Sequence, residues 1–408
     1  MSIATFTCIR TIMTPLTNSS APFSAKVSPV CVVSRTAPHR PGGRLCPVSA
    51  TLPEAPTPLP ARFPYPSSTY QWRGFRINYH VTGPEDAPTV LLVHGFGASS
   101  RHWRANVPVL ASSYRVVSID LLGFGLSEKP GDQGFAFSSE AWRDLLLDFI
   151  RDTVGGPVTL VGNSIGSLAC LLAAAEAEAA GVRVRGVAVL NTAGAMNNKG
   201  ISDDWRLKLA APLFALIDWL LAQPRIARTL FDRVREPGNI RDVLKSVYVN
   251  HDAIDDDLIE LICSPAEDKG ALETFVSIIS GPPGPRCQDL SHPMPSPSLS
   301  PTVSPDALAQ SPSGPTFPSS DPVHPRLPRS PIDKIRDGTI RVPLLLLWGD
   351  RDPFTPIDGP VGKYFRALPE TRPDTVFTIV PDCGHCPHDD NPKAVHAHLL
   401  PWLEQLHT

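Results

Sequence analysis

The stretch that decides the fold is Val158–Ala174, with the sequence VTLVGNSIGSLACLLAA. It begins as a short apolar run typical of a buried strand and continues as an Ala/Leu-rich segment typical of a buried helix. Between the two, residues 162–166 (GNSIG) match G-x-S-x-G, a tight strand-to-helix turn that exposes its serine. Side chains two residues from the serine would clash in so tight a turn, which explains both glycines. The stretch therefore predicts an α/β architecture with Ser164 at a strand end.

Other strand-like runs occur on both sides of this stretch. One alternates apolar and polar residues, the others are continuous and apolar, and helix-periodic segments such as residues 138–154 lie between them. This pattern predicts a mostly parallel sheet with helices on both faces. The runs are FRINYHV (75–81), TVLLVHG (89–95), RVVSID (115–120), RGVAVLN (185–191), VPLLLLWGD (342–350) and TVFTIVPD (375–382).

The alternation is interrupted after residue 191, where the pattern is helical until about residue 280. We therefore expect a helical cap over residues 195–285, inserted before the last two strands, with core segments at residues 66–194 and 330–408. Residues 286–329 are dominated by Pro and Ser and hold few large apolar side chains. Such a composition cannot bury enough surface to order itself, so it predicts a disordered insert with no catalytic role.

The N-terminal segment differs in composition from the rest of the chain. It is basic and rich in hydroxyl residues, with no acidic residue before Glu54. Residues 1–55 are therefore predicted to be an organelle transit peptide, the alternative being a plain disordered terminus. Without this leader the chain is more acidic than its overall formal charge of −3, which disfavours a nucleic-acid partner.

Cysteine usage and hydropathy bear on the redox compartment and on membrane insertion. The 8 cysteines are scattered, which is not the pattern of a disulfide framework and favours a reducing compartment. The most apolar segment, residues 209–222, is too short to span a bilayer and contains Asp218. No transmembrane helix is expected.

A serine hydroxyl becomes a good nucleophile only when a base takes its proton, so Ser164 requires a histidine and an acid that orients it. In this architecture the chain order is Ser, Asp, His. Asp350 and Asp352 follow the predicted strand at 342–350, and His385 follows the next one. We favour Asp352 because the acid usually lies a few residues into the loop, although Asp350 stays an alternative. Either aspartate could instead stabilise its own turn.

The turn at residues 93–98 (VHGFGA) is suited to stabilising an oxyanion. The backbone N–H groups of Phe96 and Ile165 are the expected donors. The Phe96 side chain could equally form a pocket wall. We assign structural roles to His94, within the turn, and to Asp120, which precedes Ser164 in the chain.

Residues 381–390 (PDCGHCPHDD) permit three interpretations. The spacing of Cys383 and Cys386 resembles a dithiol redox centre, the Cys/His/Asp density suggests a metal site, and His385 could be a hydrolase base. A redox dithiol needs its first cysteine at a helix start in a thioredoxin-like unit, and no second ligand cluster is visible for a metal. The third interpretation is favoured, with the cysteines packing in the loop.

A serine at position 164 favours acyl transfer, which leaves ester, thioester or amide hydrolysis, acyl transfer to another alcohol, or carbon–carbon cleavage by the same triad. The predicted cap contains an apolar, helix-periodic stretch at residues 203–231. It could pack on the core, or it could form a tunnel for a long hydrocarbon chain and dock on a membrane surface. The sequence leaves both possibilities open.

Several strings resemble the plant and algal chloroplast α/β-hydrolases typified by chlorophyll dephytylase, with pheophytinase a more distant relative. The resemblance covers roughly residues 70–285 and 330–406. Its narrower strings are MNNK (196–199) and GPPGP (281–285), whereas the triad motifs are shared by the whole superfamily. Members of the family pass almost directly from GPPGP to the counterpart of SPIDKIRDG. Residues 286–329 are therefore either an added loop or a retained intron.

The resemblance implies the α/β-hydrolase fold and hydrolysis of the phytyl ester of chlorophyll, giving chlorophyllide and phytol. Ser164 would attack the ester carbonyl, His385 would transfer the proton, Asp352 would orient His385, and the Phe96 and Ile165 amides would bind the oxyanion. No cofactor or metal of the enzyme's own is implied, because Mg²⁺ belongs to the pigment. It also implies a chloroplast location with thylakoid association.

Two alternatives remain for the function. One is a general plastid carboxylester or lipid hydrolase with the same triad. The other is a non-catalytic receptor for a small molecule on a hydrolase scaffold.

Overall fold

The computed structural model describes residues 63–131, 133–196, 216, 218–281 and 340–408. The predicted leader (1–55) and the predicted insert (286–329) lie outside the described residues. So do residues 203–215 of the apolar cap stretch. The domain boundaries that fall in these segments stay predictions.

The described residues contain a single sheet of eight strands in the order β1-β2-β4-β3-β5-β6-β7-β8. β1 and β2, and β2 and β4, pair antiparallel, and every other pair is parallel. This mostly parallel sheet confirms the predicted α/β-hydrolase fold class. The strands are β1 (Ser67–Trp72), β2 (Phe75–Thr82), β3 (Thr89–Val93), β4 (Arg115–Ile119), β5 (Val158–Asn163), β6 (Val184–Leu190), β7 (Leu344–Gly349) and β8 (Thr375–Val380).

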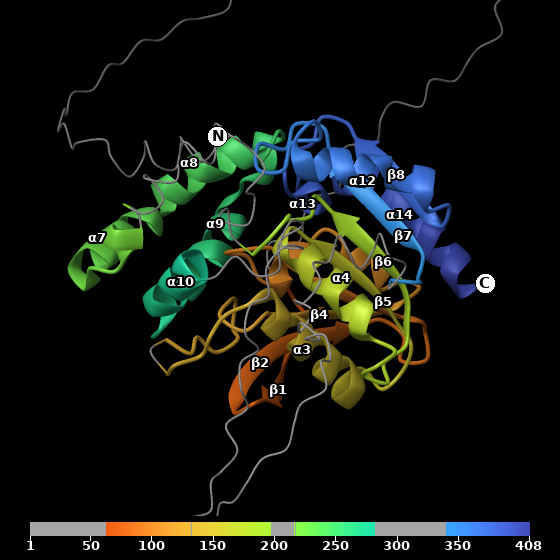
Figure 1. Cartoon of the computed structure of the whole chain (residues 1–408), viewed down its shortest axis with the longest axis horizontal. Coiled ribbons are helices and arrows are strands. Elements are labelled where there is room, and N and C mark those ends of the chain that lie inside the picture. Colours follow the sequence, from red (N-terminus) through yellow and green to blue (C-terminus); the bar gives the residue numbers. More distant parts are fainter. Residues whose placement is uncertain (1–62, 132, 197–215, 217, 282–339) are drawn as a thin grey trace, which may run out of the picture.

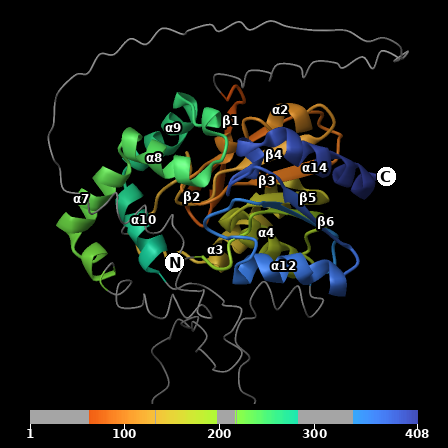
Figure 2. The same ribbon diagram turned by 90° about the horizontal axis from the view of Figure 1, so that it is seen from above.

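Helices cover both faces of the sheet, and Figure 2 shows α3, α4 and α12 on one side and α2 and α14 on the other. The helices of the core are η1 (Ser100–Trp103), α2 (Val107–Leu110), α3 (Ser139–Phe149), η2 (Ile150–Val154), α4 (Ile165–Glu176), α12 (Pro360–Thr371), α13 (Pro387–Asp390) and α14 (Pro392–His407). Those between β6 and β7 are α7 (Pro224–Val234), α8 (Pro237–Val247), η4 (His251–Ala253), α9 (Asp256–Cys263), η5 (Ser264–Glu267) and α10 (Ala271–Ser280).

The central strands are apolar without interruption because both of their faces are covered. All residues of β3, β5 and β7 are buried. One apolar cluster joins the sheet to α3, α4 and α12 and includes Trp142 and Phe365. A second cluster on the other face joins it to α2 and α14 and includes Trp402. The sheet is thus the middle of three layers, and its burial holds the strand ends in place.

The described residues 218–281, which lie between β6 and β7, form a helical unit that we call the cap. Figure 1 shows α7, α8, α9 and α10 of the cap side by side with the sheet layers, on the side away from α12 and α14. Two small apolar clusters lie within it, one around Tyr248 and Leu258 and one around Phe231 and Leu272. None of the helices among the described residues has both the length and the hydropathy of a membrane span.

Candidate active site

Ser164 lies between β5 and α4 with a φ of 54° and a ψ of −121°. A non-glycine residue in this region is strained, and such strain occurs where a turn must expose a side chain. A methyl group on Gly162 would lie 2.6 Å from the carbonyl carbon of Gly166, and one on Gly166 would lie 2.4 Å from the carbonyl oxygen of Val93. The glycines therefore permit the turn, as the motif predicts.

His385 follows β8 and touches both of the other predicted triad residues. Its Nε2 lies 2.9 Å from Ser164 Oγ and its Nδ1 lies 2.8 Å from Asp352 Oδ2. All three side chains are buried, with residue exposures of 3–8%. The structure thus brings together Ser164, His385 and Asp352 from the carboxyl ends of β5, β8 and β7. An ordered chain of this kind can move a proton from the hydroxyl to the imidazole.

Asp352 is held by several donors besides His385. Its Oδ2 accepts hydrogen bonds from Asn191 Nδ2 at 2.7 Å and Thr355 Oγ1 at 2.6 Å. Its Oδ1 accepts from the backbone N–H groups of Phe354 and Thr355. Burial by itself raises the pKa of Asp352, but His385 and the Thr355 bonds outweigh burial, so the pKa lies below its ordinary value. The carboxylate is therefore ionised at neutral pH.

Asp350, the alternative acid, has a different environment. Its Oδ1 accepts a hydrogen bond from the backbone N–H of Cys383 at 3.0 Å, and the residue is exposed. The carboxylate stabilises the loop that carries His385, whereas Asp352 contacts the imidazole itself. The geometry therefore favours Asp352 as the acid.

The two predicted oxyanion donors belong to residues near Ser164, one next to it in the chain and one in the turn after β3. Ile165 is the first residue of α4, where backbone N–H groups have no partner within the helix. Phe96 follows Gly95, and a methyl group on Gly95 would lie 3.2 Å from Ser164 Cβ. The turn after β3 is thus packed directly against the serine. Both N–H groups are suited to a negatively charged oxygen forming there.

His94 and Asp120 have the structural roles expected from the sequence. His94 donates from Nδ1 to the carbonyl oxygen of Gly95 and accepts at Nε2 from the N–H of Leu121, and burial lowers its pKa. Asp120 accepts from the backbone N–H groups of Ser100 and Leu126. These contacts hold the loops around the site in place and leave neither residue free to act as a base.

Two asparagines that were not among the predicted site residues support the site. Asn191, just after β6, donates to Asp352 and accepts from the N–H of Gly349 at 2.9 Å. Asn163 donates from Nδ2 to the carbonyl oxygen of His385 at 3.0 Å. Each lies at the carboxyl end of a parallel strand, which is the signal that could have found them.

Cys383 and Cys386 are buried and have no disulfide partner among the described residues. Burial raises the pKa of both thiols, so neither has the thiolate character of a redox centre. Cys383 packs in the core cluster on the α14 face, and Cys386 packs with Tyr248 and Leu258 of the cap. The cysteines therefore pack the loop on either side of His385.

His388, close by, contacts His102 at 3.3 Å rather than His385, and its ring packs on Trp103 at 4.2 Å. Burial lowers its pKa well below the ordinary value. It is a neutral core residue.

Aromatic side chains lie next to the triad and to the turn after β3. Phe354 packs edge-on against the His385 ring with centroids 5.1 Å apart, and Phe96 contacts Phe124 and Phe275. Phe96 and Phe354 are each 41% exposed. The rim of the site is therefore apolar, with Phe275 supplied by α10 of the cap.

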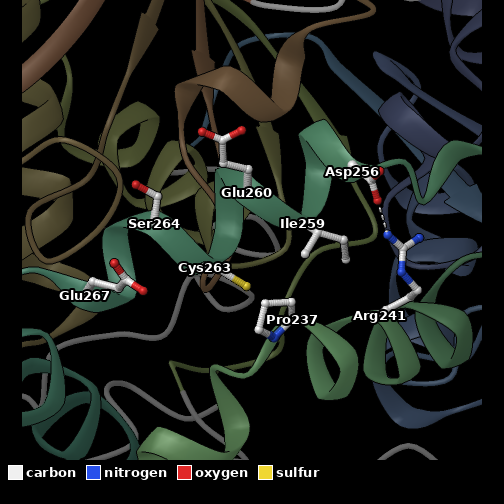
Figure 3. Close-up of a pocket in the computed structure, with 8 residues that line it drawn as sticks. All are labelled: Pro237, Arg241, Asp256, Ile259, Glu260, Cys263, Ser264 and Glu267. Carbon is white, nitrogen blue, oxygen red and sulfur yellow. Dashed lines mark hydrogen bonds and ion pairs between the residues drawn. The ribbon is translucent and has the colours of Figure 1, made fainter.

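A cavity of about 460 Å³ lies elsewhere, between α8 and the α9–η5 segment of the cap. Figure 3 shows its lining, in which Arg241 pairs with Asp256 at one end, the acidic Glu267 lies at the opposite end and Glu260 lies between them. No triad residue lines it. The cavity is separate from the candidate active site.

Comparison with known proteins gives relatives of this chain. Pheophytinase, chloroplastic, from Arabidopsis thaliana is 25% identical over 371 residues, covering 82% of this chain and 66% of that protein. The chain thus spans slightly less than two thirds of the relative's length.

Solved structures with the same fold include a serine hydrolase involved in carbazole degradation (CarC), with a TM-score of 0.55 and 20% identity over 84% of this chain and 99% of that one. They also include a thermophilic esterase from Thermogutta terrifontis, with a TM-score of 0.54 and 20% identity over 84% of this chain and 100% of that one. The model of the alpha/beta hydrolase family matches residues 90–398. The chain belongs to the alpha/beta hydrolase family.

Proposed function

We propose that the chain is a serine esterase that cleaves the phytyl ester of chlorophyll, giving chlorophyllide and phytol. The observation that carries the esterase assignment is the continuous hydrogen-bonded chain from Asp352 through His385 to Ser164. The pigment substrate is supported by the chloroplastic pheophytinase among the relatives. It is also supported by the resemblance of the chain to the dephytylase family.

In the proposed reaction, Ser164 Oγ attacks the ester carbonyl while His385 Nε2 takes its proton. The Phe96 and Ile165 amides bind the oxyanion that forms. Protonated His385 then gives the proton to the departing phytol oxygen, which leaves an acyl-enzyme on Ser164. Water repeats the cycle and releases the acid. Asp352 stays ionised and stabilises the imidazolium in both halves.

The apolar rim of the site suits such a substrate. Phe96, Phe275 and Phe354 offer flat surfaces to a macrocycle or an isoprenoid chain, and apolar contact area supplies most of the binding free energy for such groups. The Mg²⁺ of chlorophyll enters with the substrate, so the proposed reaction uses no metal of the enzyme's own.

We propose a chloroplast location with peripheral association with the thylakoid membrane. The relative's printed name and the composition of the leader support the compartment. At the N-terminal end of the cap, Trp219 and the preceding Leu216 are 59% and 46% exposed, and the nearby Arg225 and Arg228 are exposed as well. Exposed apolar side chains beside cations suit an anionic lipid surface.

The test is turnover of four substrates by the purified protein: chlorophyll a, pheophytin a, a galactolipid and a short aryl ester. Phytol release from a pigment supports the proposal, and turnover of the aryl ester alone refutes the pigment assignment. Hydrolysis of the galactolipid in preference to pigment indicates the general plastid lipid hydrolase.

Ser164→Ala provides the second part of this test. We expect it to lower kcat at least about 10⁴-fold, because the nucleophile is lost. Ser112→Ala, at an exposed serine, is the matched control and keeps wild-type turnover. If Ser164→Ala retained function in vivo, the receptor alternative would be favoured over catalysis.

A further inference from the structure

The loop that carries His385 is bonded directly to the cap. The backbone N–H of His385 donates to the carbonyl oxygen of Val247 at 3.0 Å. Val247 is the last residue of α8, where helix carbonyls lack partners within the helix. At the preceding Gly384, a methyl group would lie 1.9 Å from the same oxygen, so only glycine allows the approach. The cap thus contributes a hydrogen bond to the backbone of the proposed base.

Asp390 strengthens this junction from the other side. Its Oδ2 accepts hydrogen bonds from the N–H of Gly384 at 2.6 Å and of Val249 at 3.0 Å, and its Oδ1 accepts from the N–H of Asn250 at 2.7 Å. The residue is only 2% exposed. A single buried carboxylate therefore joins one N–H of the triad loop to two of the cap, and bonds to an ionised acceptor are stronger than neutral ones.

A second set of charged side chains also joins the cap to the core. Arg104 contacts Asp389 at 3.0 and 3.2 Å and Asp255 of the cap at 2.6 and 2.8 Å. The Tyr248 hydroxyl also donates to Asp389 at 3.0 Å. The side chains of Arg104 and Asp389 are buried, whereas that of Asp255 is 37% exposed. Through these contacts the cap residues near 248–255 are joined to the core.

The orientation of His385 depends on this arrangement. Its N–H is held by Val247 and its carbonyl oxygen by Asn163, while its ring must reach Asp352 at 2.8 Å and Ser164 at 2.9 Å. A displacement of about 1 Å in a group that takes part in catalysis can lower a rate about 100-fold. The backbone anchors therefore set the alignment of the imidazole.

We infer that Asp390 is a positioning residue, which holds Gly384 against Val249 and Asn250 so that the cap completes the placement of the His385 base. This inference rests on the proposed esterase function. Asp390 touches no reacting atom and acts through the peptide between Gly384 and His385. The cap accordingly helps to position the proposed base.

The experiment compares Asp390→Asn with wild type by labelling with a fluorophosphonate. Ser164 attacks phosphorus, fluoride leaves and His385 takes the proton, so the labelling rate constant reports the base. The final stoichiometry counts the folded sites. The Asn side chain places an NH₂ group, which cannot accept a hydrogen bond, where a carboxylate oxygen accepted from backbone N–H groups. We therefore expect a 10- to 100-fold lower labelling rate constant with nearly full stoichiometry. With a short aryl ester, kcat falls by a similar factor and KM changes less than threefold.

Asp382→Asn is the matched control. Asp382 is in the same loop, but its carboxylate pairs with the exposed Arg351, and its φ of 51° suits Asn as well as Asp. We expect its labelling rate constant to stay within twofold of wild type.

A second pair of variants tests the cap side of the junction. Asn250 has a φ of −84°, close to the value of about −65° that proline imposes. Asn250→Pro removes the N–H that donates to Asp390, whereas Asn250→Ala removes only the side chain. We expect the proline variant to be labelled at least fivefold more slowly than the alanine variant. This comparison tests the inference even if Asp390→Asn does not fold.

Each outcome distinguishes the inference from the function on which it rests. If wild type is labelled at Ser164 but Asp390→Asn changes only the stoichiometry, or the two Asn250 variants label equally fast, the positioning role is wrong and the esterase stands. If wild type is not labelled, or Ser164→Ala is labelled as fast as wild type, the esterase assignment fails and the positioning role with it.

Discussion

At the scale of single residues, the choice between two neighbouring aspartates can be tested directly. Asp352→Asn keeps the shape of the side chain but removes its negative charge. The variant can therefore no longer stabilise the positive charge that His385 acquires when it takes the proton. We expect kcat to fall about 10⁴-fold, the loss that an Asp-to-Asn change causes in a serine protease triad. Asp350→Asn, at the exposed turn residue, should change kcat less than about threefold. Steady-state kinetics with one ester decides the assignment, and the reverse order of effects would make Asp350 the acid.

Only some residues of the candidate site could be predicted from the sequence. Ser164 and His385 follow from a local motif and from chain order, because each lies just past a strand whose apolar run is easy to recognise. Asn191 also lies just past a strand, but its bond to Asp352 exists only once the loops after β6 and β7 meet, and Thr355 bonds Asp352 from within the same loop without any motif that marks it. Local patterns predict which residues can react, whereas their support depends on tertiary contacts.

At the scale of elements, Arg104 links η1, α13 and the cap. Arg104→Met leaves the Asp389 carboxylate, which is 1% exposed, without its main cation. Breaking a buried pair in this way costs about 3–5 kcal/mol, and we expect that loss of unfolding free energy in urea. Arg241→Gln removes an ion pair whose aspartate side chain is 99% exposed, and it should cost less than about 1 kcal/mol. Equal losses in the two variants would show that the Arg104 junction does not hold the cap.

Elements were predictable in proportion to their burial. The apolar runs that became β3, β5 and β7 are buried along their whole length, and their continuous apolar sequence identified each of them. β1 was missed because it lies at the sheet edge, with only Trp72 buried, so its pattern carries no continuous apolar run. The helical insert was recognisable as an interruption of the strand pattern. Its attachment to the core through Asp390 was not, because a carboxylate that binds backbone N–H groups leaves no mark in periodicity.

At the scale of the whole molecule, fully or partly buried histidines make stability depend on pH. Burial lowers the pKa of His102 and of His396 to about 4, below the unfolded value of about 6.5. Unfolding therefore takes up protons between pH 6.5 and pH 4, so the stabilisation present above pH 6.5 is lost as the pH falls through this window. His396, on α14, contributes at most about 3 kcal/mol.

His396→Gln, which keeps a donor for Asn106 Oδ1, isolates one of these groups. We expect its unfolding free energy to fall less steeply with pH than that of wild type between pH 6.5 and pH 4. The two slopes should differ by up to about 1.4 kcal/mol per pH unit, because the variant lacks one imidazole that takes up a proton on unfolding. Above pH 7 the two slopes should coincide. His398→Gln, at an exposed position on the same helix, should follow wild type throughout. Urea titrations at each pH measure the difference, and parallel curves for wild type and His396→Gln would place the acid sensitivity in the histidines packed beneath the cap instead.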